Sequence, residues 1–404
     1  MDTITHGIAG ALIGKAVFRG EDLLVMRPMN RRRIITWALM LGAIFPDSDV
    51  LREVFSDNEL LIVTWHRSIT HSLVCLPLFA LALAGLTRLL ARRFKWEAPG
   101  FAALTGIYAV GILSHILLDL VTSFGTMIWS PIKWSRPAWD LIFIIDFTFT
   151  AILLLPQLLA WVYVHPEKLK RRALGIWLFF APAPLLIAAI GRVVGAPISN
   201  RVVIAAIVLF TGLFLLPALR GWGLHVRQSS WNLAGFVGAL AYIALALYAH
   251  HAAFARVEQF ASWNHLEVET IGALPNPPSL WQWDGLIRTP RGVYELRMDL
   301  TDKPARSEVT SADPASASML EYRFYPEALP NSYIDAARRL PEVQHVLWFS
   351  RFPVTRFRKE GSAAIVEISD MRFASRRPGR LPGFTYRVRL SGDGSVLSHG
   401  WARP

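Results

Sequence analysis

Long apolar segments recur through the first 250 residues, and they limit what this chain can fold into. A helix needs about 20 residues to cross the roughly 30 Å hydrocarbon layer of a bilayer. Eight segments approach that length: 4–18, 34–51, 72–91, 101–121, 141–164, 173–191, 202–219 and 231–250. The first is short, and its Gly7, Gly10 and Gly14 share one face, which suits close helix contact or an interfacial segment. The sequence therefore predicts an α-helical integral membrane bundle of seven to eight helices.

The rest of the chain has a different character. Asp and Glu number 13 in residues 1–250 and 17 in residues 251–404, and after His251 apolar and polar residues alternate as in half-buried strands. We predict strands near 293–300, 320–325, 344–352, 363–369 and 384–391, a hairpin turn at 392–394 and a mobile loop at 301–318. The predicted division is a transmembrane helical domain at 1–250, a linker at 251–275 and a smaller β-rich (α+β) extramembrane domain at 276–404.

Lysines and arginines lie in short groups between the apolar segments, although the formal charge is +12. The groups are Arg31–Arg33, Arg92–Lys95, Lys168–Arg172 and Arg220–Arg227. Cytoplasmic loops of membrane proteins carry such groups, so we expect the lipid bilayer as a partner and no nucleic acid. If these groups are cytoplasmic and the chain has eight spans, the outer side of the membrane contains loops 46–71, 122–140 and 192–201 and everything after residue 250. The single cysteine, Cys75, excludes an internal disulfide and a cysteine-based zinc cluster.

Ionisable side chains inside apolar segments cost at least about 2.5–3.5 kcal/mol at the bilayer centre, so each needs an explanation. His115 and Asp119 are i and i+4 on a predicted helix, where they would chelate one ion or form a buried hydrogen bond. Pro46 ends an earlier apolar segment and leaves Asp47 and Asp49 on a loop. Two carboxylates at that spacing suit a cation, but solvated acids at a helix stop would have the same pattern.

Further polar residues accompany these two motifs. His66 and His71 are about 140° apart around a straight helix, so they face one ion only if a turn or cap intervenes. Arg67 is either a bidentate clamp for a phosphate or carboxylate or an interfacial side chain. His6, near the start of the first segment, is by itself typical of packing or a solvated position, and Asp140 is an acid within an outer loop.

The topology inferred from the basic groups places all these residues toward one face of the bundle. Independent solvated residues would be distributed over both faces, so the one-sided placement favours a convergent metal site. Imidazoles and carboxylates without thiolates suit zinc above all, with manganese or magnesium as alternatives. The predicted ligands are His6, Asp47, Asp49, His66, His71, His115 and Asp119.

These motifs, in this order, resemble the YdjM-like family of bacterial membrane-bound, metal-dependent hydrolases, which includes LexA-regulated members. The resemblance covers residues 1–150 well and, more loosely, the later helices and the tail that begins near Pro275, with Ser68 in place of an expected glycine. It implies a hydrolase in the bacterial inner (cytoplasmic) membrane. With the topology inferred from the basic groups, we expect a multi-pass protein whose C-terminal domain is periplasmic. The motifs that carry it are Asp2-x-x-Thr5-His6, Phe45-Pro46-Asp47-x-Asp49, His66-Arg67-x-x-Thr70-His71-Ser72, Ser114-His115-x-Leu-Leu-Asp119 and Thr122-Ser123-x-Gly125.

Two functions fit this pattern. The first is metal-dependent hydrolysis of a lipid or phosphoester substrate at the outer membrane–water interface, where an ion would lower the pKa of a water molecule toward about 7. Arg67 would then clamp an anionic substrate, and Asp140 would act as a base or support a ligand. The alternative is a non-enzymatic transporter or scaffold with a structural metal or a buried His/Asp network. The one-sided placement and the lack of an evident repeat favour the enzyme.

Overall fold

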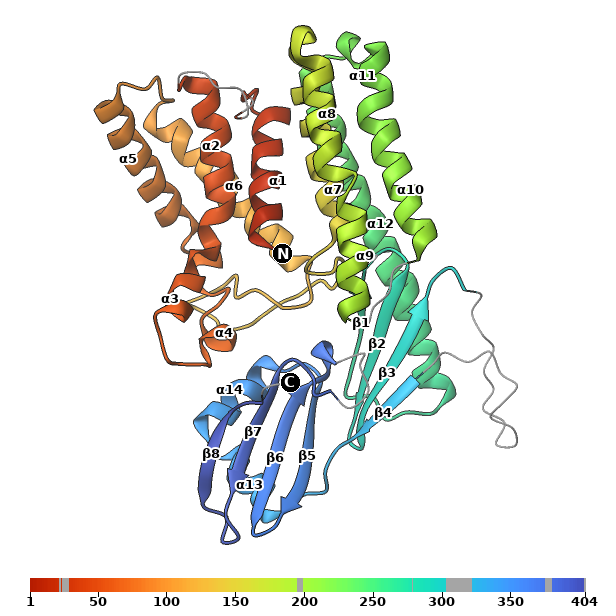
Figure 1. Ribbon diagram of the computed structural model, residues 1–404. Coiled ribbons are helices and arrows are strands. Elements are labelled where there is room, and N and C mark those ends of the chain that lie inside the picture. The colour runs from red at the N-terminus through yellow and green to blue at the C-terminus, as the bar shows by residue number, and fades with distance from the viewer. Residues whose placement is uncertain are drawn as a thin grey trace.

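The computed structural model consists of a helical part followed by a part built on two β-sheets (Figure 1). It describes residues 1–21, 23, 29–194, 199–277, 279–302, 322–374 and 380–402. This arrangement confirms the predicted fold class, a helical membrane region followed by a β-rich domain. The segment predicted to be a mobile loop, 301–318, lies almost wholly outside the described residues.

The first group of helices contains α1 (Thr3–Ala16), α2 (Arg31–Ile44), α5 (Leu76–Phe94) and α6 (Phe101–Leu120). Helix α1 begins where the Asp2 carboxylate accepts from the Thr5 backbone N–H at 2.9 Å. Its glycines let α2 approach closely, because a Cβ on Gly10 would lie 2.5 Å from the Leu39 carbonyl oxygen. The prediction of close contact at this glycine face is therefore confirmed.

Short helices follow α2 at the end of the bundle that faces the sheets. They are η1 (Phe45–Asp49), α3 (Val50–Val54), α4 (Leu61–Thr64) and η2 (Ile69–His71). Pro46 occupies the first turn of η1, where the 3₁₀ geometry ends the regular α2 ladder. Because of these tight turns, Asp47, Asp49 and His71 lie on short 3₁₀ segments and do not continue one straight helix.

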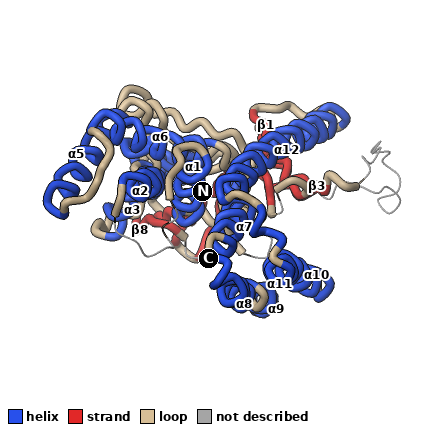
Figure 2. The backbone as a smooth tube through the Cα atoms, turned by 90° about the horizontal axis from the view of Figure 1, so that it is seen from above, coloured by secondary structure: helices blue, strands red, loops and turns tan. Residues whose placement is uncertain are grey.

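The second group contains α7 (Phe147–Tyr163), which packs against α12 and α8, while α9, α10 and α11 lie on one side of it (Figure 2). Asp146 caps α7 by accepting from the N–H groups of Thr148 and Phe149, and it also accepts from the Tyr242 hydroxyl at 2.7 Å. The remaining elements are η3 (Pro166–Lys168), α8 (Leu169–Phe180), α9 (Ala183–Val194), α10 (Asn200–Phe210), η4 (Thr211–Leu215), α11 (Leu216–Arg220), η5 (Trp222–His225) and α12 (Gln228–Trp263).

The number of membrane spans is smaller than the seven to eight predicted. Five helical stretches in the described part of the chain are long and apolar enough to cross a bilayer, or six if the pair 61–71 and 76–94, bent by 70°, forms one span. Helix α1 has 14 residues, fewer than the roughly 17–25 that a bilayer crossing needs, and α7 has 17, at the lower end of that range. The sequence count was too high because apolar composition alone does not separate a buried helix from a spanning one.

The described residues of the C-terminal part form two four-stranded antiparallel sheets, each with its strands in sequence order. The first sheet has β1 (Thr270–Asn276), β2 (Gln282–Thr289), β3 (Gly292–Asp299) and β4 (Tyr322–Pro326). The second has β5 (Pro353–Glu360), β6 (Ala363–Asp370), β7 (Thr385–Leu390) and β8 (Val396–Trp401), preceded by α13 (Ser332–Arg338) and α14 (Pro341–Phe349) and with η6 (Met371–Phe373) after β6.

Two sequence predictions in this region are wrong. The predicted strand 344–352 is mostly helix α14, in which Pro341 starts the first turn and Val343, Val346 and Phe349 are buried at helical spacing. The range 251–275, predicted to be a linker, holds the end of α12 and the start of β1 instead. Helix α12 continues because Ala253, Val257 and Phe260 pack on the first sheet and give the helix an apolar face there.

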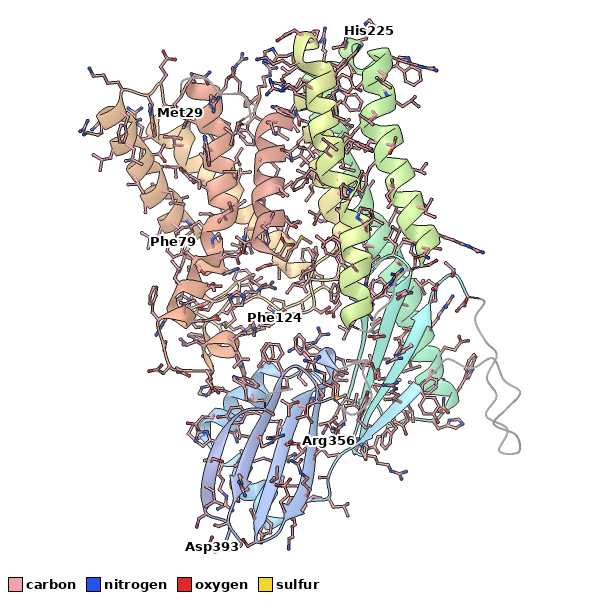
Figure 3. All side chains as sticks on the ribbon, in the orientation of Figure 1. Met29, Phe79, Phe124, His225, Arg356 and Asp393 are labelled. Carbon is pink, nitrogen blue, oxygen red and sulfur yellow. The ribbon has the colours of Figure 1, made fainter. Side chains whose placement is uncertain are left out.

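The C-terminal part packs directly beneath the loops that carry the polar motifs (Figure 3). One hydrophobic cluster joins Leu60, Val63 and Phe124 of the helical part to residues of α13, α14 and the second sheet. Arg372 strengthens the contact, because its Nη1 donates to the Ser123 carbonyl oxygen at 2.9 Å. The sheets therefore cover the end of the bundle at which the predicted site lies.

Candidate metal centre

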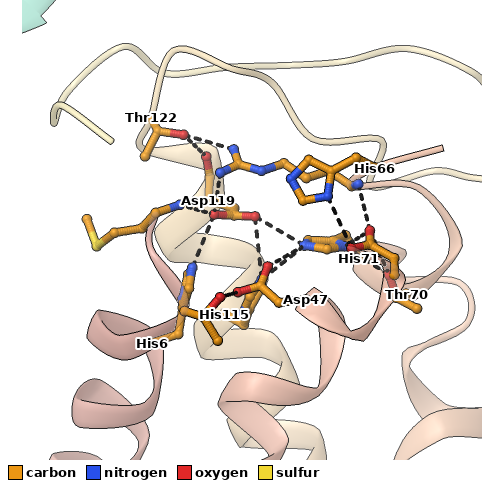
Figure 4. Close-up of polar contacts among 12 residues, drawn as sticks. His6, Asp47, His66, Thr70, His71, His115, Asp119 and Thr122 are labelled. Atoms are coloured by element: carbon orange, nitrogen blue, oxygen red, sulfur yellow. Dashed lines mark hydrogen bonds and ion pairs between the residues drawn. The ribbon is translucent and has the colours of Figure 1, made fainter. Parts of the chain in front are cut away.

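Three separate segments bring the cluster together. His115 and Asp119 project from one face of α6 near its C-terminal end, and both are completely buried. Asp47 lies on η1 and His71 on η2. The four side chains offer ligand atoms that all lie within 4.8 Å of one another. The structure thus unites the motifs that the sequence placed at one face (Figure 4).

The distances within the cluster suit a shared cation. The Nε2 atoms of His71 and His115 are 3.0 Å apart. Asp119 Oδ2 lies 3.2 Å from His71 Nε2 and 3.4 Å from His115 Nε2. Asp47 Oδ1 approaches the same two nitrogens at 3.7 and 3.5 Å. Two imidazole nitrogens and two carboxylate oxygens therefore face one point.

In both imidazoles, the partner of the outer nitrogen, Nδ1, determines whether the inner nitrogen, Nε2, carries a proton or a lone pair. His115 Nδ1 lies 2.6 Å from the Ala43 carbonyl oxygen, which only accepts, so Nδ1 carries the proton and a neutral ring turns a lone pair inward from Nε2. His71 Nδ1 faces Asp49 Oδ2 at 3.5 Å and the Thr70 hydroxyl at 3.0 Å, which favours the same tautomer. Two lone pairs facing each other repel unless a cation or proton lies between them.

Asp119 has a matching unsatisfied atom. Its Oδ2 is buried and finds no hydrogen-bond donor among the described residues, although it lies beside both inner imidazole nitrogens. Buried carboxylate oxygens without donors are rare because their desolvation is costly. A divalent cation would satisfy this oxygen and both lone pairs at once. The residues present therefore fit a metal ion.

The other three predicted ligands surround this group of four. His6 is fully buried, its Nε2 lies 3.2 Å from Asp119 Oδ1, and its ring stacks on that of His115 with centroids 3.6 Å apart. Asp49 orients the histidines instead of joining them, because its Oδ1 lies 3.1 Å from His66 Nδ1 and its Oδ2 faces His71. His66 is the most exposed of the set, at 18% of its side chain. The structure thus brings all seven residues into one contiguous cluster.

Arg67 lies inside this cluster despite its charge. Its Nη2 is 3.0 Å from Asp119 Oδ1, and its Nη1 donates to the Thr122 hydroxyl at 3.0 Å. Its backbone has a φ of +61°, a left-handed conformation that costs a non-glycine residue about 1–2 kcal/mol. The Asp49 carboxylate offsets that cost by accepting the Arg67 backbone N–H at 2.9 Å. This bend at Arg67 is the turn between His66 and His71 that the sequence requires for both histidines to face one ion.

Asp140 is not brought into the cluster. Its carboxylate forms two contacts with Arg351 of the C-terminal part, at 3.0 Å to Nη1 and 2.9 Å to Nη2. It is buried, and its φ is +54°. Asp140 therefore joins the helical part to the sheets, a role that the sequence could not indicate because its partner is 211 residues away.

Sequence reasoning missed Arg136, which holds the turn of the site from the other side. Its guanidinium donates to the carbonyl oxygens of Val63, His66 and Gly125 at 2.6, 3.2 and 3.2 Å. Burial, together with the charges of Arg67 and Arg372, lowers the pKa of Arg136 to about 9. The available signal was a basic residue in a predicted outer loop, where the positive-inside rule expects few.

Comparison with known proteins agrees with the motifs. No curated protein and no solved structure matches the chain significantly. The model of the family described as YdjM inner membrane protein matches residues 1–195, a range that contains the four clustered side chains, Arg67 and Arg136. The resemblance seen in the motifs is thereby confirmed, and the part of this membrane protein that carries the candidate metal centre is YdjM-like.

Proposed function

We propose that this protein is a membrane-bound, metal-dependent hydrolase that acts on a lipid or phosphoester at the outer membrane–water interface. One observation carries the proposal: the inner nitrogens of His71 and His115 face each other at 3.0 Å beside a donorless oxygen of Asp119. Such an arrangement is costly in an empty, buried site and favourable around a cation.

Asp47, His71, His115 and Asp119 would hold the ion. Two imidazoles and two carboxylates without thiolate suit zinc above all, with manganese or magnesium as alternatives. When bound, such an ion polarises a phosphoryl or carbonyl group and makes a water molecule more acidic. Ala43 and Asp49 hold the outer ring nitrogens, so the inner nitrogens keep their direction toward the ion.

Two residues at the edge of the cluster suit the chemistry around a substrate. His66 is partly exposed and its ring is oriented by Asp49, an arrangement in which an imidazole can take up or release a proton. Arg67 Nε is buried and has no partner among the described residues, so it could donate to an anionic substrate. The guanidinium groups of Arg67 and Arg136 each lie 5.0 Å from the Phe124 ring centroid, and together they favour an anion at this end.

The membrane side follows from the basic groups. Met29, next to the group Arg31–Arg33, and His225, within the group Arg220–Arg227, lie at the end of the bundle opposite the sheets (Figure 3). Helices α5 and α8 bring the other two groups to that same end (Figure 1). Since basic loops stay in the cytoplasm, we propose that the cluster and the C-terminal part face the periplasm.

Metal analysis of detergent-purified protein, combined with hydrolysis assays, tests the proposal. We expect about one divalent ion or more per chain, lost in His71→Ala and Asp119→Asn and retained in His225→Ala, a control at the opposite end. Phospholipid vesicles and p-nitrophenyl phosphate are then assayed with zinc, manganese and magnesium. Hydrolysis that disappears in the two cluster variants supports the enzyme. Full metal retention in both variants would overturn the site, and bound metal without any hydrolysis would favour the non-enzymatic scaffold.

A further inference from the structure

A groove lies between α7 and α8 at the end of the bundle far from the metal cluster. It has a volume of about 680 Å³. Most of its wall is apolar, and Gly175 opens it, since a Cβ there would meet nothing within 4 Å. The lining residues are Leu154, Leu158, Trp161, Ile176, Phe179 and Phe180, with Gly175 and three basic residues.

The basic residues gather at one end of this groove. Arg172 is fixed there, because its Nη1 donates to the Trp161 carbonyl oxygen at 2.7 Å and its guanidinium lies 4.5 Å from the Trp161 ring. Lys168 and Arg171 are exposed, and neither side chain has a hydrogen bond or ion pair within the described part of the chain. Two uncompensated cations therefore stand beside an indole at the mouth of an apolar groove.

The groove continues along α7 toward the middle of the bundle. A second cavity, of about 390 Å³, lies between α7, α9 and α10 and shares Leu154 and Phe180 with the first. Its wall is apolar apart from Thr150 and extends to Phe147. From Trp161 to Phe147 a helix rises about 20 Å at 1.5 Å per residue, more than half the hydrocarbon thickness. A chain entering at the basic end could thus lie along α7 through its whole leaflet.

We propose that this groove binds one anionic phospholipid, with its phosphate between Lys168 and Arg171 and an acyl chain along α7. Helices α8, α9 and α10 lie in stretches that are long and apolar enough to cross a bilayer, and α7 is a shorter apolar helix, so hydrocarbon is the medium around them. A free phosphate would not account for the apolar wall, and a neutral lipid would not account for the cations. The Trp161 indole suits the boundary between headgroup and chain. This site is separate from the metal cluster and does not depend on hydrolysis.

Native mass spectrometry of the full chain, given equal amounts of phosphatidylglycerol and phosphatidylcholine in detergent, tests the proposal. We expect retention of phosphatidylglycerol over phosphatidylcholine, and a loss of that preference by about tenfold or more in the double variant Lys168→Ala/Arg171→Ala. The matched control is Arg92→Ala/Arg93→Ala, which removes two exposed cations at the end of α5 that line no described cavity. It should keep the preference within about twofold.

A second variant tests whether the lipid binds in the groove or only to the charged surface beside it. Gly175→Phe fills the groove and leaves every cation in place, so it should reduce adducts of both lipids. Leu158→Trp serves the same purpose from α7 if the α8 variant does not give a monodisperse protein with native helicity. Equal losses in the Lys168/Arg171 and Arg92/Arg93 variants would overturn the proposal, as would full lipid retention in a well-folded groove-filled variant.

Discussion

His115 Nδ1 donates to the carbonyl oxygen of Ala43 over 2.6 Å, and this contact crosses from α6 to α2. The two helices can come so close because both carry glycine there. A Cβ on Gly111 would lie 2.8 Å from the Leu39 carbonyl oxygen and 3.0 Å from the Gly42 Cα. The direction of a candidate metal ligand therefore depends on a helix contact that lies outside the cluster.

We predict that Gly111→Ala separates α2 from α6 and weakens metal binding. Overpacking of this kind costs about 1–3 kcal/mol, which should lower the unfolding midpoint as well as the metal affinity. The matched control is Gly106→Ala on the same helix, because a Cβ at Gly106 would meet nothing within 4 Å. Isothermal titration with zinc and thermal unfolding measure both quantities. Equal behaviour of the two variants would contradict the dependence on helix contact.

Removal of the metal from the cluster should lower the thermal stability of the protein. An ion present at 100 times its Kd stabilises the folded state by about 2.7 kcal/mol, so chelation should lower the melting temperature and zinc should restore it. His71→Ala should abolish the zinc-dependent shift, whereas His225→Ala should keep it, since His225 lies at the opposite end (Figure 3). A zinc-dependent shift that survives in the His71 variant would place the ion elsewhere.

The helical motifs were predictable from sequence because their geometry is local. His115 and Asp119 share a face by helix periodicity alone, and the one-sided placement of Asp47 and His71 follows from hydropathy and basic loops. The division between ligand and supporting residue was not predictable. Asp49 contacts His66 and His71 because the bend at Arg67 turns them toward it, and that bend depends on long-range contacts.

In the C-terminal part, tertiary packing decides secondary structure that local alternation leaves open. Residues 344–352 alternate in a way that fits a strand over a few positions, while the burial of Val343, Val346 and Phe349 requires a helix against the second sheet. Asp140 illustrates the same point for function. Its ion pair with Arg351 is a tertiary contact, and no local pattern marks either residue as a partner of the other.

Arg136 should matter for both the site and the fold. Arg136→Gln removes donors from the carbonyl oxygens of Val63, His66 and Gly125, and unsatisfied buried carbonyls cost about 1–3 kcal/mol each. We expect a lower unfolding midpoint and weaker zinc binding, because the turn that carries His66 loosens. Lys133→Gln, at an exposed position of the same loop, is the control. Normal zinc affinity in a destabilised Arg136 variant would limit this residue to a structural role.

The Asp140–Arg351 pair should couple the two parts of the chain. A double-mutant cycle with Asp140→Asn and Arg351→Gln is expected to give a coupling energy of about 1–2 kcal/mol, since the pair is bidentate and its carboxylate is buried. Thermal unfolding followed by tryptophan fluorescence provides the measurement. Strictly additive effects of the two substitutions would show that the contact does not hold the sheets against the helical part.

The orientation in the membrane can be tested because the chain has one cysteine. In a Cys75→Ser background, Leu397→Cys places a thiol on exposed strand β8, and Glu97→Cys places one at the basic end between α5 and α6. Since basic loops remain in the cytoplasm, a membrane-impermeant maleimide added to cells with a permeabilised outer membrane should label position 397 and not position 97. Both should react after solubilisation in detergent, which controls for accessibility. Labelling of position 97 alone would reverse the topology and put the metal cluster and the sheets on the cytoplasmic side.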